Sequence, residues 1–308
     1  YGRYYAAELA KKHESWIKKT GAQALIPVPI HKERHKKTCN IRRNNMRFGF
    51  IGAGNMAQAM IGGILKAKLV SKDEIIASAA TQKTLDAVKD KFGVQTTLDN
   101  QEIAKADMIF LAVKPVYCEQ VLREIKDKLT KDRIIVSIAA GKTMAWLEEQ
   151  LGKDTKIVRT MPNTPALVGE GITAVCPNEQ VTDKELTQVC EVLESFGKAE
   201  VIKESMMDAV IAVSGSSPAY VFMFIEAMAD AAVAEGMPRA QAYRFAAQSV
   251  LGSAKMVLET GKHPGELKDM VCSPAGTTIE AVRVLEQTGF RGSVMECMKA
   301  CADKSRNM

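Results

Sequence analysis

Glycines and an alanine at fixed spacing mark the first place where this sequence could do chemistry. Residues 48–57 read FGFIGAGNMA, so Gly52, Gly54 and Ala57 form a G-x-G-x-x-A pattern after an apolar run. The first glycine permits a tight turn, the second lets the backbone approach a pyrophosphate, and the alanine allows close helix–strand packing. The start of the following helix supplies N–H donors and a positive dipole for phosphate. The residues that we expect at this dinucleotide site are Gly52, Ala53, Gly54, Asn55 and Met56.

The turn after the second expected strand bears on the choice of cofactor. Residues 78–83 read SAATQK and contain no Asp or Glu, which NAD-selective sites carry for the ribose hydroxyls. Asp73 and Glu74 precede the strand and therefore belong at its opposite end. A neutral, hydroxyl-rich turn with one lysine tolerates a 2′-phosphate, so the sequence favours NADPH, with NADH as the alternative. The contacts expected here are Ser78, Thr81 and Asn100.

Two more segments end apolar runs with small residues. Residues 111–115 read LAVKP and residues 137–141 read SIAAG. Ligands of doubly wound sheets bind beyond the carboxyl ends of the strands, and small side chains there let a flat ring pass closely. Lys114 is either a solvated loop lysine or a cofactor contact. The expected contacts are Ala112, Val113, Lys114, Pro115, Ala139, Ala140 and Gly141.

Two further loops have a purely structural explanation, and the second also has a chemical one. Residues 159–166 read RTMPNTPA, in which two prolines stiffen a turn after a strand. Residues 273–278 read SPAGTT and separate two expected helices. Ser273 or Thr277 could cap the second helix, and the same cluster could offer hydroxyls and a helix N-terminus to a carboxylate.

Positioning these groups requires two kinds of architecture. Residues 46–203 alternate short apolar runs with amphipathic stretches, which is typical of βαβ units. Expected strands are 47–51, 75–78, 108–113, 134–138, 156–159, 173–175 and 200–202; expected helices are 56–66, 83–91, 117–129, 144–151 and 183–195. Later residues have only helical periodicity, over 206–213, 219–235, 239–260, 265–270, 278–288 and 292–305. We predict an α/β fold: a doubly wound, mainly parallel Rossmann-type sheet (46–204), then a smaller all-helical domain (205–308).

Composition and charge narrow the class of protein. The 308 residues are 46% hydrophobic and 25% charged, which excludes collagen-like and mostly disordered chains. The most apolar stretch, residues 209–234, contains Ser214, Pro218, Glu226 and Asp230, so we expect a buried helix and no membrane span.

The basic residues are concentrated before residue 46. Residues 1–45 hold eleven Lys or Arg against three Asp or Glu, and the remaining residues hold 31 against 33. We therefore expect no nucleic-acid partner for the body of the protein. Within this basic segment, residues 24–32 (ALIPVPIHK) with Arg34 resemble the middle of the competence-associated phosphoribosyltransferase-like family. We interpret residues 1–45 as a basic extension and fusion remnant without its own activity.

The cysteines indicate a reducing, cytoplasmic setting. There are seven, an odd count without a C-x-x-C pair. Cys297 and Cys301 share a helix face, but no histidine is near them, so we expect buried cysteines and no metal site.

Five segments together resemble the pyrroline-5-carboxylate reductase family. They are residues 49–57, 112–115, 161–166, 214–220 and, most specifically, 263–279 (HPGELKDMVCSPAGTTI). Two departures are visible: Ala275 and Ser217 stand where the family usually has glycine. The resemblance implies an NAD(P)H-dependent reduction of the imine 1-pyrroline-5-carboxylate to L-proline.

The resemblance also implies roles for the 271–278 segment. Thr278 would hydrogen-bond the imine nitrogen, with Ser273 as the second catalytic residue. The substrate would contact Val271, Ser273, Gly276, Thr277 and Thr278. The family forms intertwined dimers, and the resemblance implies a homo-oligomer, at least a dimer, with a decamer as the larger assembly. Long apolar helices rich in Met and Ala fit an intersubunit interface.

Two other functions remain as alternatives. A related two-domain hydroxyacid reductase would need a lysine at the start of the interdomain helix, and residues 209–226 contain no Lys or Arg. A non-catalytic dinucleotide-binding or scaffold protein would bind NADPH without turnover.

Overall fold

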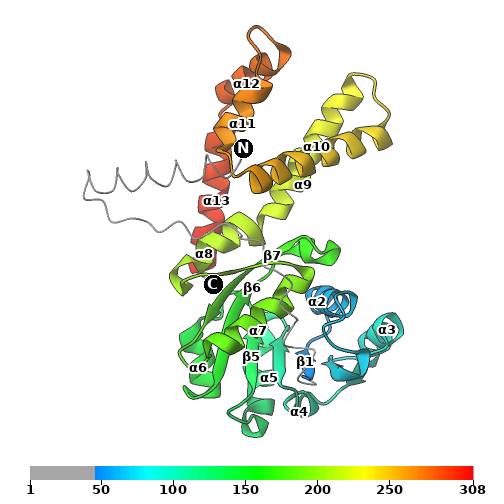
Figure 1. Cartoon of the computed structure of the whole chain (residues 1–308), viewed down its shortest axis with the longest axis vertical. Coiled ribbons are helices and arrows are strands. Elements are labelled where there is room, and N and C mark those ends of the chain that lie inside the picture. The colour runs from blue at the N-terminus through cyan, green and yellow to red at the C-terminus, as the bar shows by residue number, and fades with distance from the viewer. Residues whose placement is uncertain (1–45, 308) are drawn as a thin grey trace, which may run out of the picture. The chain divides into compact units, whose positions relative to one another are not determined.

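A computed structural model of the chain describes residues 46–307 (Figure 1). These residues fall within one compact unit. The fragment at residues 24–34 that resembles a phosphoribosyltransferase lies outside the described part.

One eight-stranded sheet organises residues 46–203. Its strands, in spatial order, are β3 (Gln95–Thr97), β2 (Ile75–Ser78), β1 (Phe48–Ile51), β4 (Met108–Leu111), β5 (Ile134–Ser137), β6 (Lys156–Met161), β7 (Gly171–Pro177) and β8 (Gly197–Val201). Every pair is parallel except β6 and β7. The order reverses at β1, which has β2 on one side and β4 on the other. This is the switch point where doubly wound sheets bind ligands.

Side chains that alternate along the central strands fill both faces of the sheet. Phe50 stacks on Phe110 of the neighbouring strand, with ring centroids 4.6 Å apart. Ile51 and Leu111 point to the opposite face and join a buried cluster that includes Leu122 and Leu147. Because successive strand residues point to opposite faces, the side chains of these apolar runs are buried only when helices cover both faces of the sheet.

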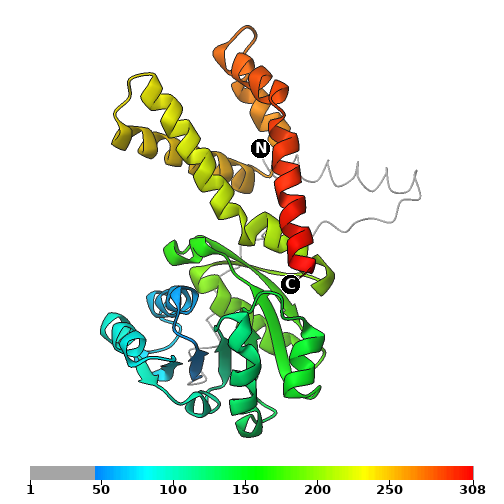
Figure 2. The same cartoon turned by 180° about the vertical axis from the view of Figure 1, so that it is seen from behind.

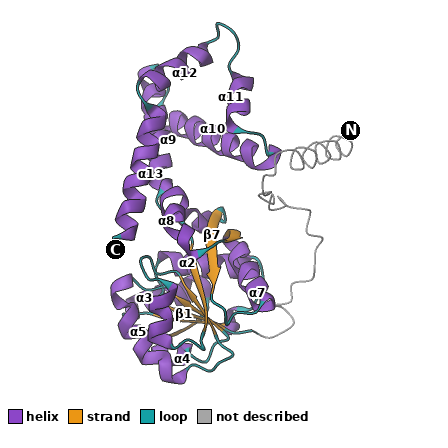
Figure 3. Ribbon diagram, turned by 90° about the vertical axis from the view of Figure 1, so that its left-hand side faces the viewer, coloured by secondary structure: helices purple, strands orange, loops and turns teal. Residues whose placement is uncertain are grey.

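Helices supply that cover. They are α2 (Asn55–Lys66), α3 (Gln82–Phe92), α4 (Asn100–Ile103), α5 (Cys118–Ile125), α6 (Met144–Leu151) and α7 (Asp183–Leu193). Helices α4, α5 and α6 contribute to the cluster on the Ile51 face, while α2 and α7 lie on the other side of the sheet (Figures 1 and 3). Polar residues begin several of them, and Thr182 forms a capping box with Glu185 at α7.

The sequence pattern predicted seven of the eight strands, with ends shifted by a few residues. It missed β3 and the one-turn helix α4. Strand β3 has the sequence QTT and lies at the sheet edge, where only pairing with β2 defines it. Three polar residues carry no two-residue hydrophobic pattern, so nothing local could reveal this strand.

All later elements are helical. They are α8 (Met207–Val210), a π-helical turn (Ile211–Gly215), α9 (Ser217–Ala234), α10 (Arg239–Thr260), α11 (Pro264–Val271), α12 (Thr277–Gln287) and α13 (Phe290–Arg306). Helices α9 and α10 form a hairpin, and the last turns of α13 return to α8 (Figure 2). The expected helix over 206–213 is thus interrupted by the π turn.

The prediction that residues 209–234 form a buried helix is wrong for the single chain, because most of these side chains are exposed or half-buried. In α9 only Pro218 and Ala229 are buried, and Phe222 is 61% exposed. The expected burial of the cysteine pair is also wrong, because Cys297 is exposed and Cys301 is half-buried. Hydrophobic character predicts burial but does not say whether the covering surface belongs to the same chain.

One helical stretch within residues 46–307 is long and apolar enough to cross a membrane by length and composition alone. It is Glu204–Ala234, with mean hydropathy 1.4 over its most apolar window, of which 6% is buried. The π turn and Pro218 interrupt it, and Glu226 and Asp230 lie within it.

Candidate cofactor and substrate sites

The glycine loop contains one glycine that the fold requires and one that it does not. Gly52 has φ +97°, and a Cβ atom there would lie 2.6 Å from the carbonyl oxygen of Ala112. Gly54 has φ −73°, and a Cβ atom there would meet no other atom within 4 Å. The chain alone therefore gives no reason for glycine at position 54, whereas a ligand passing over the backbone does.

The start of α2 suits an anion. Gly54 is its N-cap and makes no side-chain cap hydrogen bond, and the first turn contains no acidic residue. Gly54 and Asn55 are exposed, whereas Ala53 and Ala57 are buried against the sheet. The uncapped N–H groups and the helix dipole fit a pyrophosphate, so these residues fit the dinucleotide that the sequence predicts.

Ser78 and Asn100 meet at the carboxyl end of β2. The Ser78 hydroxyl donates to Asn100 Oδ1 at 2.6 Å, and Asn100 Nδ2 donates to Glu124 Oε2 at 2.7 Å. Ser78 is only 1% exposed, while Thr81 is exposed and accepts from the Thr84 N–H as the N-cap of α3. No acidic residue follows β2 here, as the sequence indicated, but Glu124 reaches this network from α5. Sequence reasoning missed Glu124, because it is 24 residues away from Asn100.

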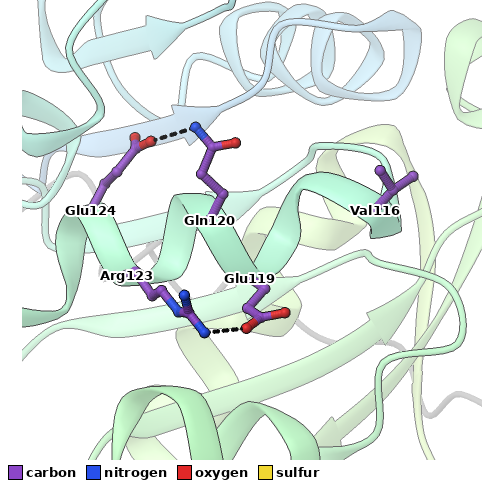
Figure 4. Close-up of a pocket in the computed structure, with 5 residues that line it drawn as sticks. All are labelled: Val116, Glu119, Gln120, Arg123 and Glu124. Carbon is purple, nitrogen blue, oxygen red and sulfur yellow. Dashed lines mark hydrogen bonds and ion pairs between the residues drawn. The ribbon is translucent and has the colours of Figure 1, made fainter.

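A pocket of about 510 Å³ lies along the outer face of α5. Its lining residues are Val116, Glu119, Gln120, Arg123 and Glu124 (Figure 4). Arg123 pairs with Glu119, and Gln120 Nε2 donates to Glu124 Oε1 at 3.0 Å. The partners of the Glu124 carboxylate, Gln120 and Asn100, are neutral amides, so the pocket places an acidic group beside the Ser78–Asn100 end of the site.

The loops after β4 and β5 continue the same edge of the sheet. Ala139 is 3% exposed, and Gly141 has φ +72°, where glycine avoids the strain of a side chain. Ala112, Val113, Pro115, Ala140 and Gly141 are half-buried. Lys114 is exposed at the N-cap position before Pro115, which leaves both of its predicted roles open.

The 271–278 segment joins α11 to α12. Gly276 is the N-cap of α12 and makes no side-chain cap bond, so neither Ser273 nor Thr277 caps this helix. A Cβ atom on Gly276 would lie 2.3 Å from Ser273 Oγ. The close approach of Ser273 therefore leaves no room for a side chain at position 276. Thr278, the second residue of α12, is half-buried, while Val271, Ser273 and Thr277 are exposed.

Ala275 has φ +56° in this loop. That is the left-handed region, where glycine is unstrained and an L side chain costs about 1 kcal/mol. The position where the resemblance expected glycine is therefore one where the backbone favours it.

His263 has a structural role. It is the N-cap of α11, and its Nδ1 accepts from the Gly265 N–H at 3.0 Å. Helix capping accounts for this side chain without any acid–base chemistry.

The thiols near the sheet are poor nucleophiles. Burial raises the pKa of Cys118, against the opposing charge of Lys142. Burial and then the Glu204 carboxylate raise the pKa of Cys176, with Arg159 opposing them. Residues 46–307 also contain no group of three His, Cys, Asp or Glu side chains that could hold a metal ion.

An ion pair between buried Arg159 and half-buried Glu204 fixes the start of the helical region. Arg159 of β6 is 6% exposed and lies 2.6 Å from Glu204 Oε1, which also accepts from the Met144 N–H at 2.6 Å. The pair thus joins β6, α6 and the segment that enters α8. Nothing in the sequence could reveal it, since its members are 45 residues apart.

The predicted residues fall into two groups. The cofactor set follows the carboxyl ends of β1, β2, β4 and β5 at one edge of the sheet. The 271–278 set lies with α11 and α12, away from the sheet at the end of the helical region (Figures 1 and 2). One chain alone does not bring the two sets together.

Comparisons with known proteins found two matching family models. A family described as "Pyrroline-5-carboxylate reductase dimerisation" matches residues 204–308, and one described as "NADP oxidoreductase coenzyme F420-dependent" matches residues 47–141.

Individual relatives match across both regions. The pyrroline-5-carboxylate reductase of Escherichia coli is 56% identical over 263 residues, which are 85% of this chain and 98% of that protein. The solved pyrroline-5-carboxylate reductase of Coxiella burnetii has 35% identity and a TM-score of 0.80, covering 86% of this chain and 98% of its own. The Plasmodium falciparum pyrroline carboxylate reductase, solved with NADP bound, has 35% identity and a TM-score of 0.78, covering 85% and 98%.

Proposed function

The chain belongs to the pyrroline-5-carboxylate reductase family, and we propose that residues 46–204 hold its dinucleotide while residues 205–308 hold its substrate and a second copy. Its reaction is the NAD(P)H-dependent reduction of 1-pyrroline-5-carboxylate to L-proline. The observation that carries this conclusion is the 56% identity that extends across both regions. Residues 1–45 are proposed as an extension outside the reductase, since the two matching family models cover residues 47–141 and 204–308.

The proposed cofactor site runs along the edge of the sheet. Backbone N–H groups at the start of α2 bind the pyrophosphate, and Ser78, Thr81 and Asn100 hold the adenosine end. Ala112 to Pro115 and Ala139 to Gly141 border the remaining part. When bound, the reduced nicotinamide supplies the hydride that the imine carbon accepts. The absence of an acid after β2 supports NADPH, with NADH as a second cofactor.

The proposed substrate site is the loop before α12. Its uncapped helix N-terminus and the hydroxyls of Ser273 and Thr277 suit the substrate carboxylate. Thr278 hydrogen-bonds the ring nitrogen, which must carry a proton for the imine carbon to be a good electrophile. Since Thr278 is not the N-cap of α12, capping does not account for its hydroxyl. These residues act by orientation and exclusion of water, and no acid–base side chain is required.

Two copies of the chain complete the site in this proposal. The 271–278 loop lies away from the cofactor edge of its own chain (Figure 1). Exposed apolar residues such as Phe222, Phe245 and Leu258 lie on α9 and α10 of the same helical region. A second copy that buries these faces would also bring one chain's loop to the other's cofactor. A decamer built from such dimers is the larger assembly that we propose, in the cytoplasm.

The deciding experiment measures NADPH oxidation with the cyclic imine and, separately, NADPH binding alone. We expect imine-dependent oxidation of NADPH and formation of L-proline. Binding without turnover would favour the non-catalytic alternative. Turnover with a hydroxyacid but not with the imine would favour the related reductase.

A further inference from the structure

A proline in the helical region leaves one backbone carbonyl without its usual donor. Pro218 is the second residue of α9 and stands four residues after Ser214. Ser214 lies in the π turn, so the N–H of residue 218 or 219 would serve its carbonyl. Proline has no N–H, and the Ala219 N–H donates to the Ser216 carbonyl at 3.1 Å. The half-buried Ser214 carbonyl therefore takes its donor from outside its own helix.

Asn163 supplies that donor from the sheet. Its Nδ2 donates to the Ser214 carbonyl at 3.1 Å, and its Oδ1 accepts from the Ile172 N–H at 2.9 Å. The side chain is 8% exposed, so both bonds are shielded from water. One end of the amide ties the loop after β6 to β7, and the other ties the sheet to the helical region.

The segment that Asn163 holds has an irregular backbone. Residues Ile211–Gly215 form a π turn, in which the Ser216 N–H donates to the Ile211 carbonyl at 2.8 Å. Single π turns inside α-helices occur frequently at functional sites. From the other side, Cys301 Sγ of α13 lies 3.2 Å from Ser216 Oγ. The turn is thus fixed between the sheet and α13.

The position of Asn163 connects this turn with the reaction. Asn163 follows the carboxyl end of β6 by two residues, and β6 is parallel to β5, whose end leads to Ala139 and Gly141. The turn therefore lies at the edge of the sheet that carries the proposed cofactor site.

We infer that Asn163 is a positioning residue: through the Ser214 carbonyl it holds residues 214–217 at the reacting end of the cofactor site. This inference rests on the proposed reductase function. It joins two segments, 161–166 and 214–220, to which the sequence assigned no chemistry of their own.

Asn178 provides a matched control at the opposite end of the same strand pair. It is also 8% exposed, and its Oδ1 accepts from the Ile157 N–H at 3.1 Å at the start of β6. Its Nδ2 donates to the Thr155 carbonyl at 2.9 Å and to Glu148. Asn178 therefore pins β6 and β7 as Asn163 does, but it contacts nothing in the helical region.

The experiment compares Asn163→Ala with Asn178→Ala in the full-length protein. We expect both to lower the Tm, because each leaves buried backbone groups unpaired. Asn163→Ala alone should lower kcat, by about 10- to 100-fold, with NADPH affinity within about 2-fold of wild type. It alone should also speed amide hydrogen exchange in residues 211–220.

Two further variants test the route through Ser214. Asn163→Asp keeps an acceptor for the Ile172 N–H but sets a carboxylate oxygen against the Ser214 carbonyl, so it should lose kcat as Asn163→Ala does. Pro218→Ala returns an N–H to position 218, so Asn163→Ala in that background should lose less than about 3-fold in kcat.

The outcomes are separable. Equal kcat in Asn163→Ala and Asn178→Ala, after correction for the folded fraction, would overturn the inference. So would equal kcat losses from Asn163→Ala with and without Pro218→Ala. Wild-type protein that binds NADPH but never reduces the imine would instead overturn the proposed function, and the exchange measurement would still report on the turn.

Discussion

The phenylalanines of the two regions have opposite environments. In the sheet region four of the five phenylalanines, Phe48, Phe50, Phe110 and Phe196, are each at most 1% exposed, and Phe92 is half-buried. In the helical region Phe222, Phe224, Phe245 and Phe290 are between 42% and 64% exposed. The side chains are chemically identical, so the gain from leaving water is available to both sets. The difference shows that the sheet region completes its own core, whereas the helical region leaves apolar faces for another surface to cover.

The two regions also differ in how complete their proposed binding sites are within one chain. The sheet region carries an anion site in a loop whose geometry is already set within the chain. The helical region carries the proposed substrate residues on a loop that nothing in its own sheet region covers. A variant in the first region should therefore act within a single chain, and a variant in the second should act through assembly.

The largest effect is expected from Gly54→Asp. A carboxylate there would occupy the open space over the loop and repel the pyrophosphate, so NADPH affinity should fall on the order of 1000-fold. The fold should survive, since a Cβ atom at Gly54 meets no neighbour. Titration of NADPH and a thermal melt on one sample check both statements. Unchanged NADPH affinity would remove this loop from the cofactor site.

Thr278→Ala should lower turnover more than it weakens NADPH binding. Loss of one positioned hydrogen bond in a water-free site costs about 10- to 1000-fold in rate. Thr278→Ser keeps the hydroxyl and should restore most of the turnover. Steady-state kinetics decide the matter, and an Ala variant that melts earlier but turns over normally would place Thr278 outside the active site.

Phe245→Asp should separate the copies of the chain. Phe245 is 64% exposed, and burying a charge there against a second copy would raise the dimer dissociation constant by about 10- to 100-fold. Val116→Asp is the matched change in the sheet region, at a side chain that is 75% exposed, and it should leave the molar mass unchanged. Light scattering over a dilution series measures both. If Val116→Asp dissociates the protein and Phe245→Asp does not, the comparison of the two regions is reversed.

A smaller, pH-dependent effect is expected at Glu185 in the sheet region. Burial raises the pKa of this carboxyl, but hydrogen bonds from Lys156 and from Thr182 outweigh burial and hold it below its ordinary value. Because the folded-state pKa is the lower one, the pair stabilises the fold above the unfolded-state pKa. That stability is lost as pH falls through the folded-state pKa, below about pH 4.3.

Glu185→Gln should therefore flatten the acid limb of unfolding free energy against pH. The control is Asp303→Asn in the helical region. The pKa of Asp303 is also lowered, chiefly by Lys299, but this pair is exposed to solvent. Solvent screening should leave the acid limb of Asp303→Asn close to wild type. Equal flattening in both variants would show that burial does not separate the two pairs.

The smallest effect is expected from Ala275→Gly, which should stabilise the protein by about 1 kcal/mol by removing left-handed strain. Lys68 has φ +55° in the sheet region, so Lys68→Gly is the matched change and should gain a similar amount. Urea denaturation measures both. If Lys68→Gly raises the free energy of unfolding and Ala275→Gly does not, the 271–278 loop has lost its left-handed strain in the assembled protein.

Local patterns were sufficient for most elements and for the glycine loop. The runs that became β1, β2, β4 and β5 are short, apolar and followed by small residues, so both the strands and the ligand edge could be predicted. Strand β3 could not, because pairing with β2 is all that defines QTT as a strand. The family resemblance, and not periodicity, pointed to Thr278, and the structure added that this residue does not cap its helix.

The sequence by itself determined the alternation of strands and helices, the dinucleotide loop, and the family to which the chain belongs, because each depends on residue types at short spacing. Tertiary structure decided the contacts between distant residues: Ser78 with Asn100 and Glu124, Arg159 with Glu204, and Asn163 with Ser214. It also decided which apolar helices remain exposed. The physical reason is that a hydrogen bond or a buried face needs two surfaces, and a linear pattern describes only one of them.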